Sequence, residues 1–292
     1  MPWLFVLIWS TGFVVARFGM PHAPPLSFLS IRYALSLLCF GLWVVFAGVE
    51  WPRDRMQWGH LAVVGVLMHA AYLGGVWAAV KAGIGAGTVA LVVGLQPVLT
   101  ALWSSWRSRD AGAGNTAEGR VLPLQWLGLA LGFGGLILVV WNKLGVGEVT
   151  YRNLALAVVA LSSITIGTLY QKRFVAPCDV RSANAIQLFA ALVVSLPLAA
   201  TETEPIVWRA QMIGALVWSV FALTLGGSSL LYLLIQRGAA TEVTSLMYLV
   251  PPCTAALAWW LFDETFTPSM GVGMLLTATA VALVVRTPRS GS

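Results

Sequence analysis

Long apolar runs alternate with short polar stretches along this chain. Ten such runs cover residues 3–20, 27–48, 60–80, 86–106, 124–141, 153–172, 183–200, 211–235, 243–262 and 267–286. An apolar run of about 20 residues can cross the hydrocarbon layer as a helix, because a helix satisfies its own backbone hydrogen bonds. The short alternating segments of a membrane β-barrel do not occur. The pattern therefore predicts an all-α membrane protein with ten transmembrane helices.

The second half of this pattern repeats the first. At a constant offset of 155 residues, the matched pairs include Gly12 and Gly167, Arg17 and Lys172, Ile31 and Ile186, Gly83 and Gly238, Leu91 and Leu246, and Pro97 and Pro252. Each copy holds five predicted spans, and an odd number of crossings forces the second copy to start from the opposite face of the membrane. We therefore expect two inverted five-helix repeats, residues 1–145 and 146–292, which is the plan of many secondary transporters.

The charged residues give the expected orientation. Hydrophobic residues make up 59% of the chain and charged residues 10%, which excludes a soluble domain. The net charge of +6 is not the footprint of a nucleic-acid binder, because Lys and Arg are sorted by loop. With a cytoplasmic N-terminus, eleven of them lie on the inner side and five on the outer side. The sequence thus predicts a multi-pass protein of the cell inner membrane with both termini in the cytoplasm.

Enzymatic and cofactor chemistry find no support in the sequence. Three histidines and three cysteines are present without HExxH or paired-cysteine spacing, and no GxSxG motif or pair of carboxylates lies within a span. A retinal-type receptor would need a lysine in the middle of a span, but Lys81 and Lys143 lie at span ends. We therefore expect no catalytic residue, no metal site and no cofactor.

Several motifs resemble the EamA-type carriers of the drug/metabolite transporter superfamily. They are Trp9-Ser-Thr-Gly-Phe13, Arg32 in the second span, the hairpin and helix between Gly83 and Pro97, and Phe262-Asp-Glu264. Within that superfamily the chain is most similar to the YddG-type aromatic amino-acid exporters. The resemblance implies a ten-helix carrier with a substrate cavity lined by helices 1, 3, 4, 6, 8 and 9. The chain departs from the family at residues 104–107, where the acidic residue that often ends helix 4 is missing.

Polar and aromatic side chains at membrane depth are the candidates for substrate contact, because burying them in lipid is costly. His69 and Tyr72 share one face of the third span. The full set predicted on the cavity helices is Trp9, Ser10, His69, Tyr72, Trp77, Gln96, Thr100, Trp103, Ser163, Tyr170, Ser228, Tyr232 and Tyr248. The alternative is structural: a hydroxyl can bond its own i−4 carbonyl, and His69 and Tyr72 can bond a neighbouring helix.

Two further groups of residues have predicted roles outside direct contact. Pro97, Pro251 and Pro252 each leave a carbonyl without an N–H partner, so we expect hinges at these positions, although membrane helices also tolerate proline without a functional role. Arg32 and its repeat mate Gln187 lie on helices away from the implied cavity. We expect them to be structural, with Arg32 bonding helix carbonyls rather than a substrate carboxylate.

The function expected from the sequence is export of small amphipathic metabolites, amino acids and aromatic ones among them, by alternating access. A sugar-phosphate, nucleotide-sugar or drug carrier of the same superfamily is the alternative; an intramembrane enzyme, a receptor or a channel fits less well. The absence of Asp and Glu inside the spans favours a facilitative or weakly proton-coupled mechanism. The expected partners are a small-molecule substrate and the bilayer, without nucleic acid, for a monomer or weak dimer.

Overall fold

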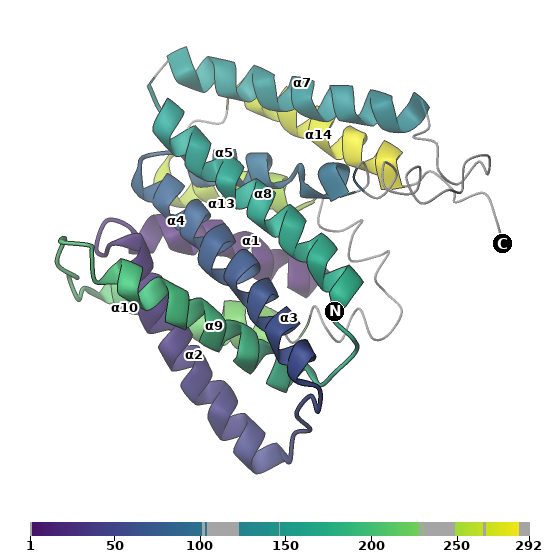
Figure 1. Ribbon diagram of the computed structural model, residues 1–292. Coiled ribbons are helices and arrows are strands. Elements are labelled where there is room, and N and C mark those ends of the chain that lie inside the picture. Colours follow the sequence, from purple (N-terminus) through teal and green to yellow (C-terminus); the bar gives the residue numbers. More distant parts are fainter. Residues whose placement is uncertain are drawn as a thin grey trace, which may run out of the picture.

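The computed structural model describes residues 2–100, 103, 123–145, 147–227, 230, 249–264 and 267–285. Their helical elements, shown in Figure 1, are α1 (Pro2–Gly19), α2 (Pro25–Ala47), α3 (Arg55–Gly65), η1 (Val66–Ala71), α4 (Tyr72–Lys81), α5 (Ala86–Val93), α7 (Pro123–Gly145), α8 (Tyr151–Phe174), α9 (Val180–Ala199), α10 (Ala210–Trp218), η3 (Ser219–Gly227), α13 (Val250–Phe262) and α14 (Pro268–Val285). Each of the ten predicted spans contains at least one of these elements. The protein is thus an all-helical membrane protein.

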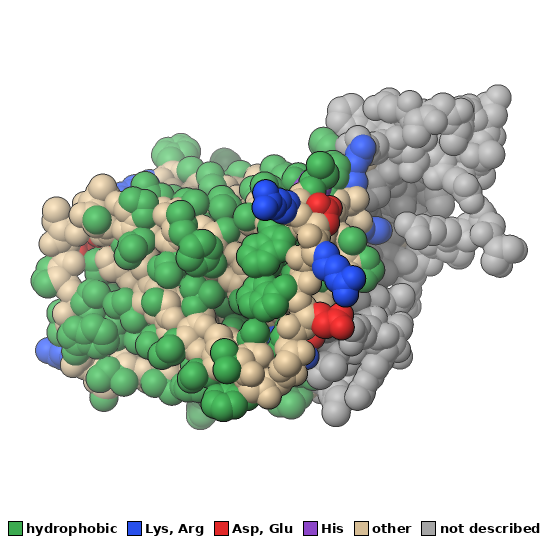
Figure 2. Space-filling view, turned by 60° about the horizontal axis from the view of Figure 1, so that its bottom comes forward, with side chains coloured by type: hydrophobic (Ala, Val, Ile, Leu, Met, Phe, Trp, Pro, Cys, Tyr) green, Lys and Arg blue, Asp and Glu red, His purple; other side chains and the backbone are tan. Residues whose placement is uncertain are grey.

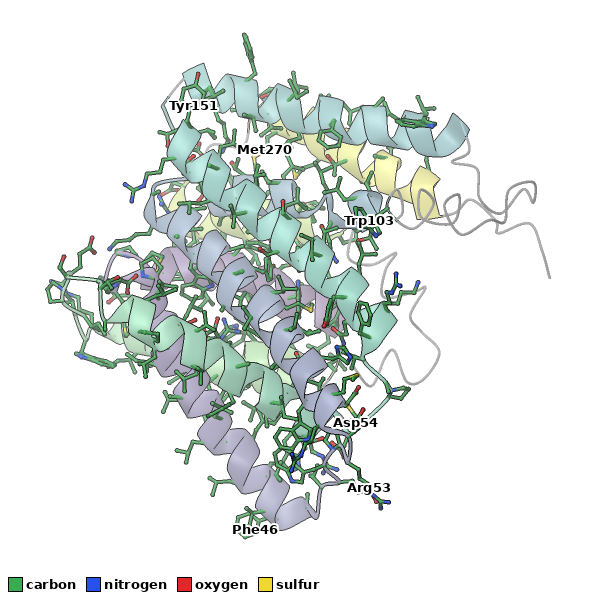
Figure 3. All side chains as sticks on the ribbon, viewed as in Figure 1. Phe46, Arg53, Asp54, Trp103, Tyr151 and Met270 are labelled. Carbon is green, nitrogen blue, oxygen red and sulfur yellow. The ribbon has the colours of Figure 1, made fainter. Side chains whose placement is uncertain are left out.

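Two spans are continuous helices that include a π-helical segment. The third span runs from α3 through η1 into α4, and the eighth runs from α10 into η3. Five helices in the described ranges are long and apolar enough to cross a membrane: Pro25–Ala47, Arg55–Lys81, Tyr151–Phe174, Val180–Ala199 and Ala210–Gly227. Large apolar side chains such as Phe46, at the tip of α2 in Figure 3, point outward from the bundle. Figure 2 shows one face of the molecule that is mostly hydrophobic, as a lipid-facing surface requires.

Polar caps start several helices earlier than the apolar pattern predicts. The side chain of Asp54 accepts a hydrogen bond from the backbone N–H of Met56, and α3 begins at Arg55 rather than at residue 60. Thr150 and Asn153 form a reciprocal capping box before α8, and the side chain of Asp179 caps α9. Each cap satisfies an N–H group of the first turn, so the helix extends beyond its apolar run.

The fourth span is broken where the prolines predict a hinge. Helix α5 ends at Val93, a turn follows at Gly94 and Leu95, and the helix resumes at Gln96. Pro97 has no N–H group to bond the Val93 carbonyl, which explains the break. In the second repeat, Pro251 and Pro252 occupy the first turn of α13. The two carbonyls that they are expected to free, of Met247 and Tyr248, lie outside the described residues.

The helices pack in pairs that cross between the repeats. Helix α2 packs on α9, α4 on α8 and α1 on α13, while α7 and α14 lie side by side at one edge of the bundle (Figure 1). Gly273 of α14 lies so close to α7 that an added Cβ would be 2.8 Å from the carbonyl oxygen of Gly135. The glycine-rich stretch of the last span is therefore used for packing within the molecule.

The two π-helical segments occupy equivalent places in the inverted repeats. The repeat offset of 155 residues carries η1, Val66–Ala71, onto residues 221–226, which lie inside η3, Ser219–Gly227. The same offset relates α2 to α9. Helix α2 packs against η3, and α9 packs against η1. The two contacts are therefore counterparts of each other.

Candidate functional site

The centre of the candidate site is Arg32, on the buried face of α2. Its side chain is only 7% exposed. Its Nε donates a hydrogen bond of 3.1 Å to Oγ1 of Thr224 in η3. In the described part of the chain, no carboxylate lies within ion-pair distance of Arg32. A cation therefore lies inside the bundle beside a hydroxyl, with no described protein anion to balance it.

Aromatic and polar side chains from both repeats lie near this guanidinium. The hydroxyl of Tyr33 donates a hydrogen bond of 2.8 Å to the His69 carbonyl oxygen. The side chain of His69 lies within interaction distance of that of Gln187 on α9. Tyr33, His69 and Tyr72 all lie within electrostatic reach of Arg32. We call this set, Arg32, Tyr33, His69, Tyr72, Gln187 and Thr224, the arginine cluster.

The arginine cluster is built from two contacts that the inverted repeat makes equivalent. The offset of 155 residues relates Arg32 to Gln187 and His69 to Thr224. The Arg32–Thr224 bond and the contact between Gln187 and His69 therefore occupy the same place in the two halves, and each joins one repeat to the other. One contact carries a charge and its counterpart is neutral, so the two halves differ chemically at this point.

The π-helical segments position the second member of each contact. In η3 the hydroxyl of Thr224 donates to the Ser219 carbonyl, five residues earlier, at 2.9 Å. In η1 the His69 carbonyl accepts a hydrogen bond from the hydroxyl of Tyr33 on α2. Just before η1, α3 touches α9 so closely that the backbone of Gln187 occupies the space where a Cβ on Gly65 would lie. Single π-turns inside α-helices often mark functional positions.

The broken fourth span forms another polar contact between the repeats. Nε2 of Gln96 donates to Oγ1 of Thr168 on α8 at 3.0 Å, and the hydroxyl of Thr100 donates to the Gln96 carbonyl at 2.9 Å. At the break, a Cβ added to Gly94 would lie 2.9 Å from Cγ of Pro251. Two of the predicted hinge regions, around Pro97 and Pro251, are thus in contact.

The remaining predicted residues are spread over the bundle. Trp9 is partly buried and its ring lies 5.3 Å from that of Phe5. The buried hydroxyl of Ser10 donates to the Val6 carbonyl at 2.7 Å, as the structural alternative predicts for hydroxyls. Ser163 is buried in α8.

Three aromatic candidates lie away from the arginine cluster or make other contacts. Trp77 is buried and stacks on Phe28, with ring centroids 4.4 Å apart. The hydroxyl of Tyr170 lies 2.9 Å from Nδ1 of His60, near the end of α8. Trp103 is 47% exposed (Figure 3). The other three candidates, Ser228, Tyr232 and Tyr248, lie outside the described residues.

Residues outside the predicted contact set complete the site. Tyr33 donates to the backbone carbonyl of His69, Thr168 partners Gln96, and Thr224 partners Arg32. The repeat offset carried a usable signal for Thr224, since it is the counterpart of His69. Tyr33 and Thr168 have no such signal, because their roles depend on which helices cross. Arg32 and Gln187, predicted to lie apart from the contact residues, are instead neighbours of His69 and Tyr72.

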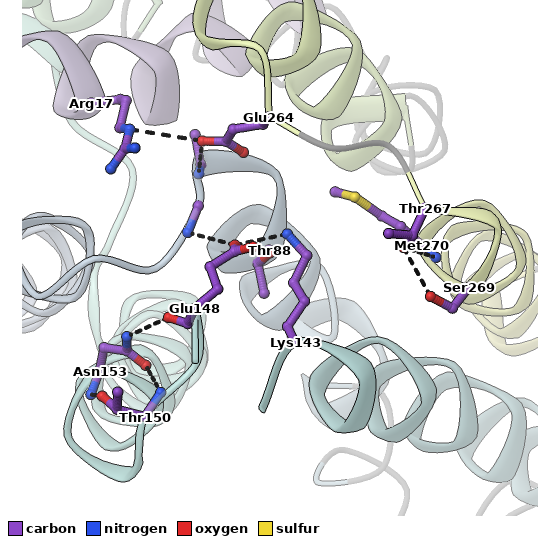
Figure 4. Close-up of polar contacts among 12 residues, drawn as sticks. Arg17, Thr88, Lys143, Glu148, Thr150, Asn153, Glu264, Thr267, Ser269 and Met270 are labelled. Carbon is purple, nitrogen blue, oxygen red and sulfur yellow. Dashed lines mark hydrogen bonds and ion pairs between the residues drawn. The ribbon is translucent and has the colours of Figure 1, made fainter. Parts of the chain in front are cut away.

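One end of the bundle is closed by polar contacts around the start of α5 (Figure 4). We call it the hairpin end, because α4 turns into α5 there. Glu148 accepts from the Gly85 N–H at 3.1 Å and pairs with Lys143 at 2.7 Å. Glu264 accepts from the Ala86 N–H at 3.0 Å. Two carboxylates thus meet the positive end of α5 and fix the hairpin to the loops around it.

Comparison with known proteins identifies the chain's relatives. A model of the EamA-like transporter family matches residues 3–141 and 152–286. The chain is 23% identical over 293 residues to a "Probable amino-acid metabolite efflux pump" of Escherichia coli K12, covering 97% of this chain and 92% of that protein. It is 25% identical over 281 residues to the uncharacterized inner membrane transporter YedA of the same organism, covering 95% and 87%.

A solved structure shows the same fold. One crystal structure of a protein superposes with a TM-score of 0.63 at 17% sequence identity, and covers 97% of this chain and 94% of the other. The two matches of the family model fall one on each half of the chain and together take up most of it. The chain therefore belongs to the EamA-like transporter family: it is a multi-pass membrane transporter and not an enzyme.

Proposed function

We propose that this transporter exports small amphipathic metabolites, amino acids and aromatic ones among them, across the inner membrane. The observation that carries the proposal is the arginine cluster. It combines a cation, an imidazole, an amide and tyrosine rings inside a bundle that is otherwise apolar. Such a mixture suits a ligand with one polar and one apolar part. Two distant relatives named as amino-acid metabolite efflux pumps, and the resemblance to YddG-type exporters, support the same substrate class.

The proposed mechanism is alternating access by rocking of the two repeats, with both termini in the cytoplasm. The break at Gly94 and Leu95 interrupts the helix beside Pro251 of the other repeat, where motion costs few backbone hydrogen bonds. The contacts between repeats at the hairpin end would break when that end opens. Gln96, Thr100, Trp9, Ser10 and Ser163 remain proposed contact residues on the helices next to this break.

A phosphate-bearing substrate fits the described site less well. A phosphate group carries up to two negative charges and is usually held by several Lys or Arg residues. Among the described residues, Arg32 is the one cation in the arginine cluster, while Lys81 and Lys143 lie at the hairpin end. A single buried guanidinium matches a monoanionic group better than a phosphate.

Transport by the purified protein in liposomes tests the proposal. We expect uptake of labelled tryptophan, phenylalanine or threonine, but not of a labelled sugar phosphate. Tyr72→Phe should reduce this uptake because it removes a buried hydroxyl from the arginine cluster. Tyr151→Phe is the matched control, since Tyr151 is 88% exposed at the start of α8. Uptake of the sugar phosphate alone would overturn the substrate class.

The same liposomes test how transport is driven. The described helices contain no Asp or Glu residue within their bounds. We therefore propose a facilitative or weakly coupled mechanism, in which a pH gradient changes the initial rate little. Strong acceleration by an imposed gradient would contradict it.

A further inference from the structure

We propose that Arg32 binds the carboxylate group of the transported molecule, an assignment that rests on the proposed transport of amino acids. The guanidinium would hold the polar end of the ligand, with the rings of Tyr33 and Tyr72 beside it. Arg32 would then be a binding residue and not only a brace between helices. Three features of the site support this role: the missing counter-charge of Arg32, its unused donors and the asymmetry of the repeat.

Arg32 has no counter-charge among the described residues. Burying a charge without a partner costs several kcal/mol in proteins, and more in the middle of a membrane. The four ion pairs in the described part of the chain all involve loops or helix ends: Arg17–Glu264, Lys81–Glu204, Lys143–Glu148 and Arg181–Asp179. Arg32 is 7% exposed and has no such partner there. An anionic ligand would supply the charge that these residues do not.

Most N–H donors of the Arg32 guanidinium are not used by the described residues. A guanidinium has five N–H groups, and the one on Nε bonds Thr224 at 3.1 Å. The Nη groups have no acceptor among the residues that the structure places. A carboxylate can accept two parallel hydrogen bonds from a guanidinium, and such charge-assisted pairs are among the strong hydrogen bonds in proteins. The neighbouring Tyr33 hydroxyl does not compete as a donor, because it donates to the His69 carbonyl.

The two repeats differ in charge at the position of Arg32. The position equivalent to Arg32 is Gln187, which is neutral, and its partner His69 replaces Thr224. A brace needed by the fold in both halves could use the same residue twice. Instead only one half carries a cation, so the two repeats together provide one anion site. The site therefore suits a single carboxylate on an asymmetric ligand.

A pair of ligands that differ only in the carboxylate tests the assignment. Tryptophan and tryptamine share the indole and the amine, and only tryptophan has a carboxylate. We would measure binding of both labelled ligands to the full-length protein in nanodiscs by scintillation proximity. The wild type should prefer tryptophan. Arg32→Gln should weaken tryptophan binding about tenfold or more, the loss expected for a charged hydrogen bond, and should not weaken binding of the cationic tryptamine, which has no carboxylate for Arg32 to hold.

Matched variants separate binding from folding. Arg181→Gln makes the same substitution outside the site, at the start of α9, and should leave both affinities as they are. Arg32→Lys keeps the charge but loses the two-pronged geometry, so it should reduce the preference for tryptophan only in part. If Arg32→Gln is not monodisperse on size exclusion, Arg32→Lys decides: a reduced preference supports the assignment, and an unchanged one overturns it.

Other results of the binding experiment would overturn the carboxylate site alone or the proposed function as well. Equal weakening of both ligands by Arg32→Gln, or no weakening of either, would show that Arg32 is a brace and overturn the carboxylate site alone. Binding of neither ligand, nor of phenylalanine or threonine, by the wild type would instead overturn the proposed function, and the carboxylate site with it.

Discussion

At the scale of single residues, the partner of a polar side chain decides whether it is available to a ligand. Hydroxyls of Ser10, Thr165 and Thr168 each donate to the carbonyl four residues earlier in their own helix. Such a bond occupies the hydroxyl proton and leaves only the oxygen to accept from another partner, as Thr168 does from Gln96. Arg32, Tyr33 and Gln96 instead reach a different helix. These longer contacts define the candidate site.

Close backbone approach gives the first prediction. Gly65→Ala should lower the stability of the protein by about 1–3 kcal/mol, because its Cβ would collide with the backbone of Gln187. Gly59→Ala is the control in the same helix, since an added Cβ there meets nothing within 4 Å. Thermal unfolding in detergent would compare them. Equal melting temperatures for the two variants would mean that α3 and α9 are not in this close contact.

The capping aspartate of α9 gives a prediction about pH. Hydrogen bonds from Arg181 hold the pKa of the Asp179 carboxyl below its ordinary value of about 3.9. Because the pKa is lower in the folded protein than in the unfolded chain, the stabilisation is present above that ordinary value and is lost as the pH falls through the folded-state value.

Asp179→Asn keeps the cap but removes the charge. We expect it to melt at a lower temperature than the wild type at pH 7. The difference should shrink as the pH falls below about 4. Melting curves over a pH series measure it, and a difference that widens in acid would contradict the sign.

At the scale of elements, α5 depends on carboxylates that come from outside its own span. Its first turn offers unpaired N–H groups at Gly85 and Ala86, and Glu148 and Glu264 accept from them. An added Cβ at Gly85 would lie 2.6 Å from Oε1 of Glu148, so only glycine leaves room for the carboxylate. The hairpin therefore holds its shape through the loops before α8 and after α13.

Neutralising one of these carboxylates tests this dependence. Glu148→Gln should destabilise the protein by about 1–2 kcal/mol, since it weakens the interaction with the helix N-terminus and removes the pairing with Lys143. Glu50→Gln alters an exposed glutamate and should have no such effect. Thermal melts at low and high salt measure this loss of stability. We expect it to be smaller at high salt, because screening already weakens the interactions of the Glu148 charge.

The apolar pattern predicted where helices lie better than how they begin or bend. Helices that start with Asp54, Thr150 or Asp179 run past their apolar segments, because a cap adds polar residues to the first turn. The π-helical segments have no signal in a helical periodicity, since one extra residue in a turn barely shifts the pattern. The break before Pro97 was predictable, because proline removes a specific donor.

The candidate site was predictable only in part. His69 and Tyr72 stood out as polar residues in an apolar span, and Arg32 and Gln187 as repeat mates. That these four lie together depends on how α2 and α9 cross the π-helical segments, and helix crossings are not visible in the sequence. The repeat would have suggested Thr224 as a partner, but nothing in the sequence pairs Tyr33 with a carbonyl of η1.

At the scale of the whole molecule, the hairpin end ties the two repeats together. The carboxylate of Glu202 accepts from the backbone N–H groups of Leu26 and Ser27 at 3.0 and 2.7 Å. Lys81 pairs with Glu204 at 2.6 Å. Each contact joins the first repeat to the second, so opening this end requires them to break.

A reversible covalent link across this end should arrest transport. With Cys39, Cys178 and Cys253 replaced by serine, Lys81→Cys and Glu204→Cys place two thiols on either side of the ion pair, where a thiol-specific cross-linker with a disulfide in its spacer can bridge them. We expect this cross-linker to stop uptake into liposomes and a reducing agent to restore it, because a linked end cannot open. The two single-cysteine variants are the controls. Full uptake by a completely linked protein would show that this end does not open during transport.

The unbalanced guanidinium of Arg32 has an electrical consequence. A charge carried across the whole membrane potential gains or loses about 2.3 kcal/mol per 100 mV. Rocking of the repeats would carry Arg32 through a fraction of that field, whether the carrier is empty or loaded with a zwitterion. The transport rate would then depend on the membrane potential even for a substrate without net charge. Replacing Arg32 by glutamine would make that rate insensitive to the potential.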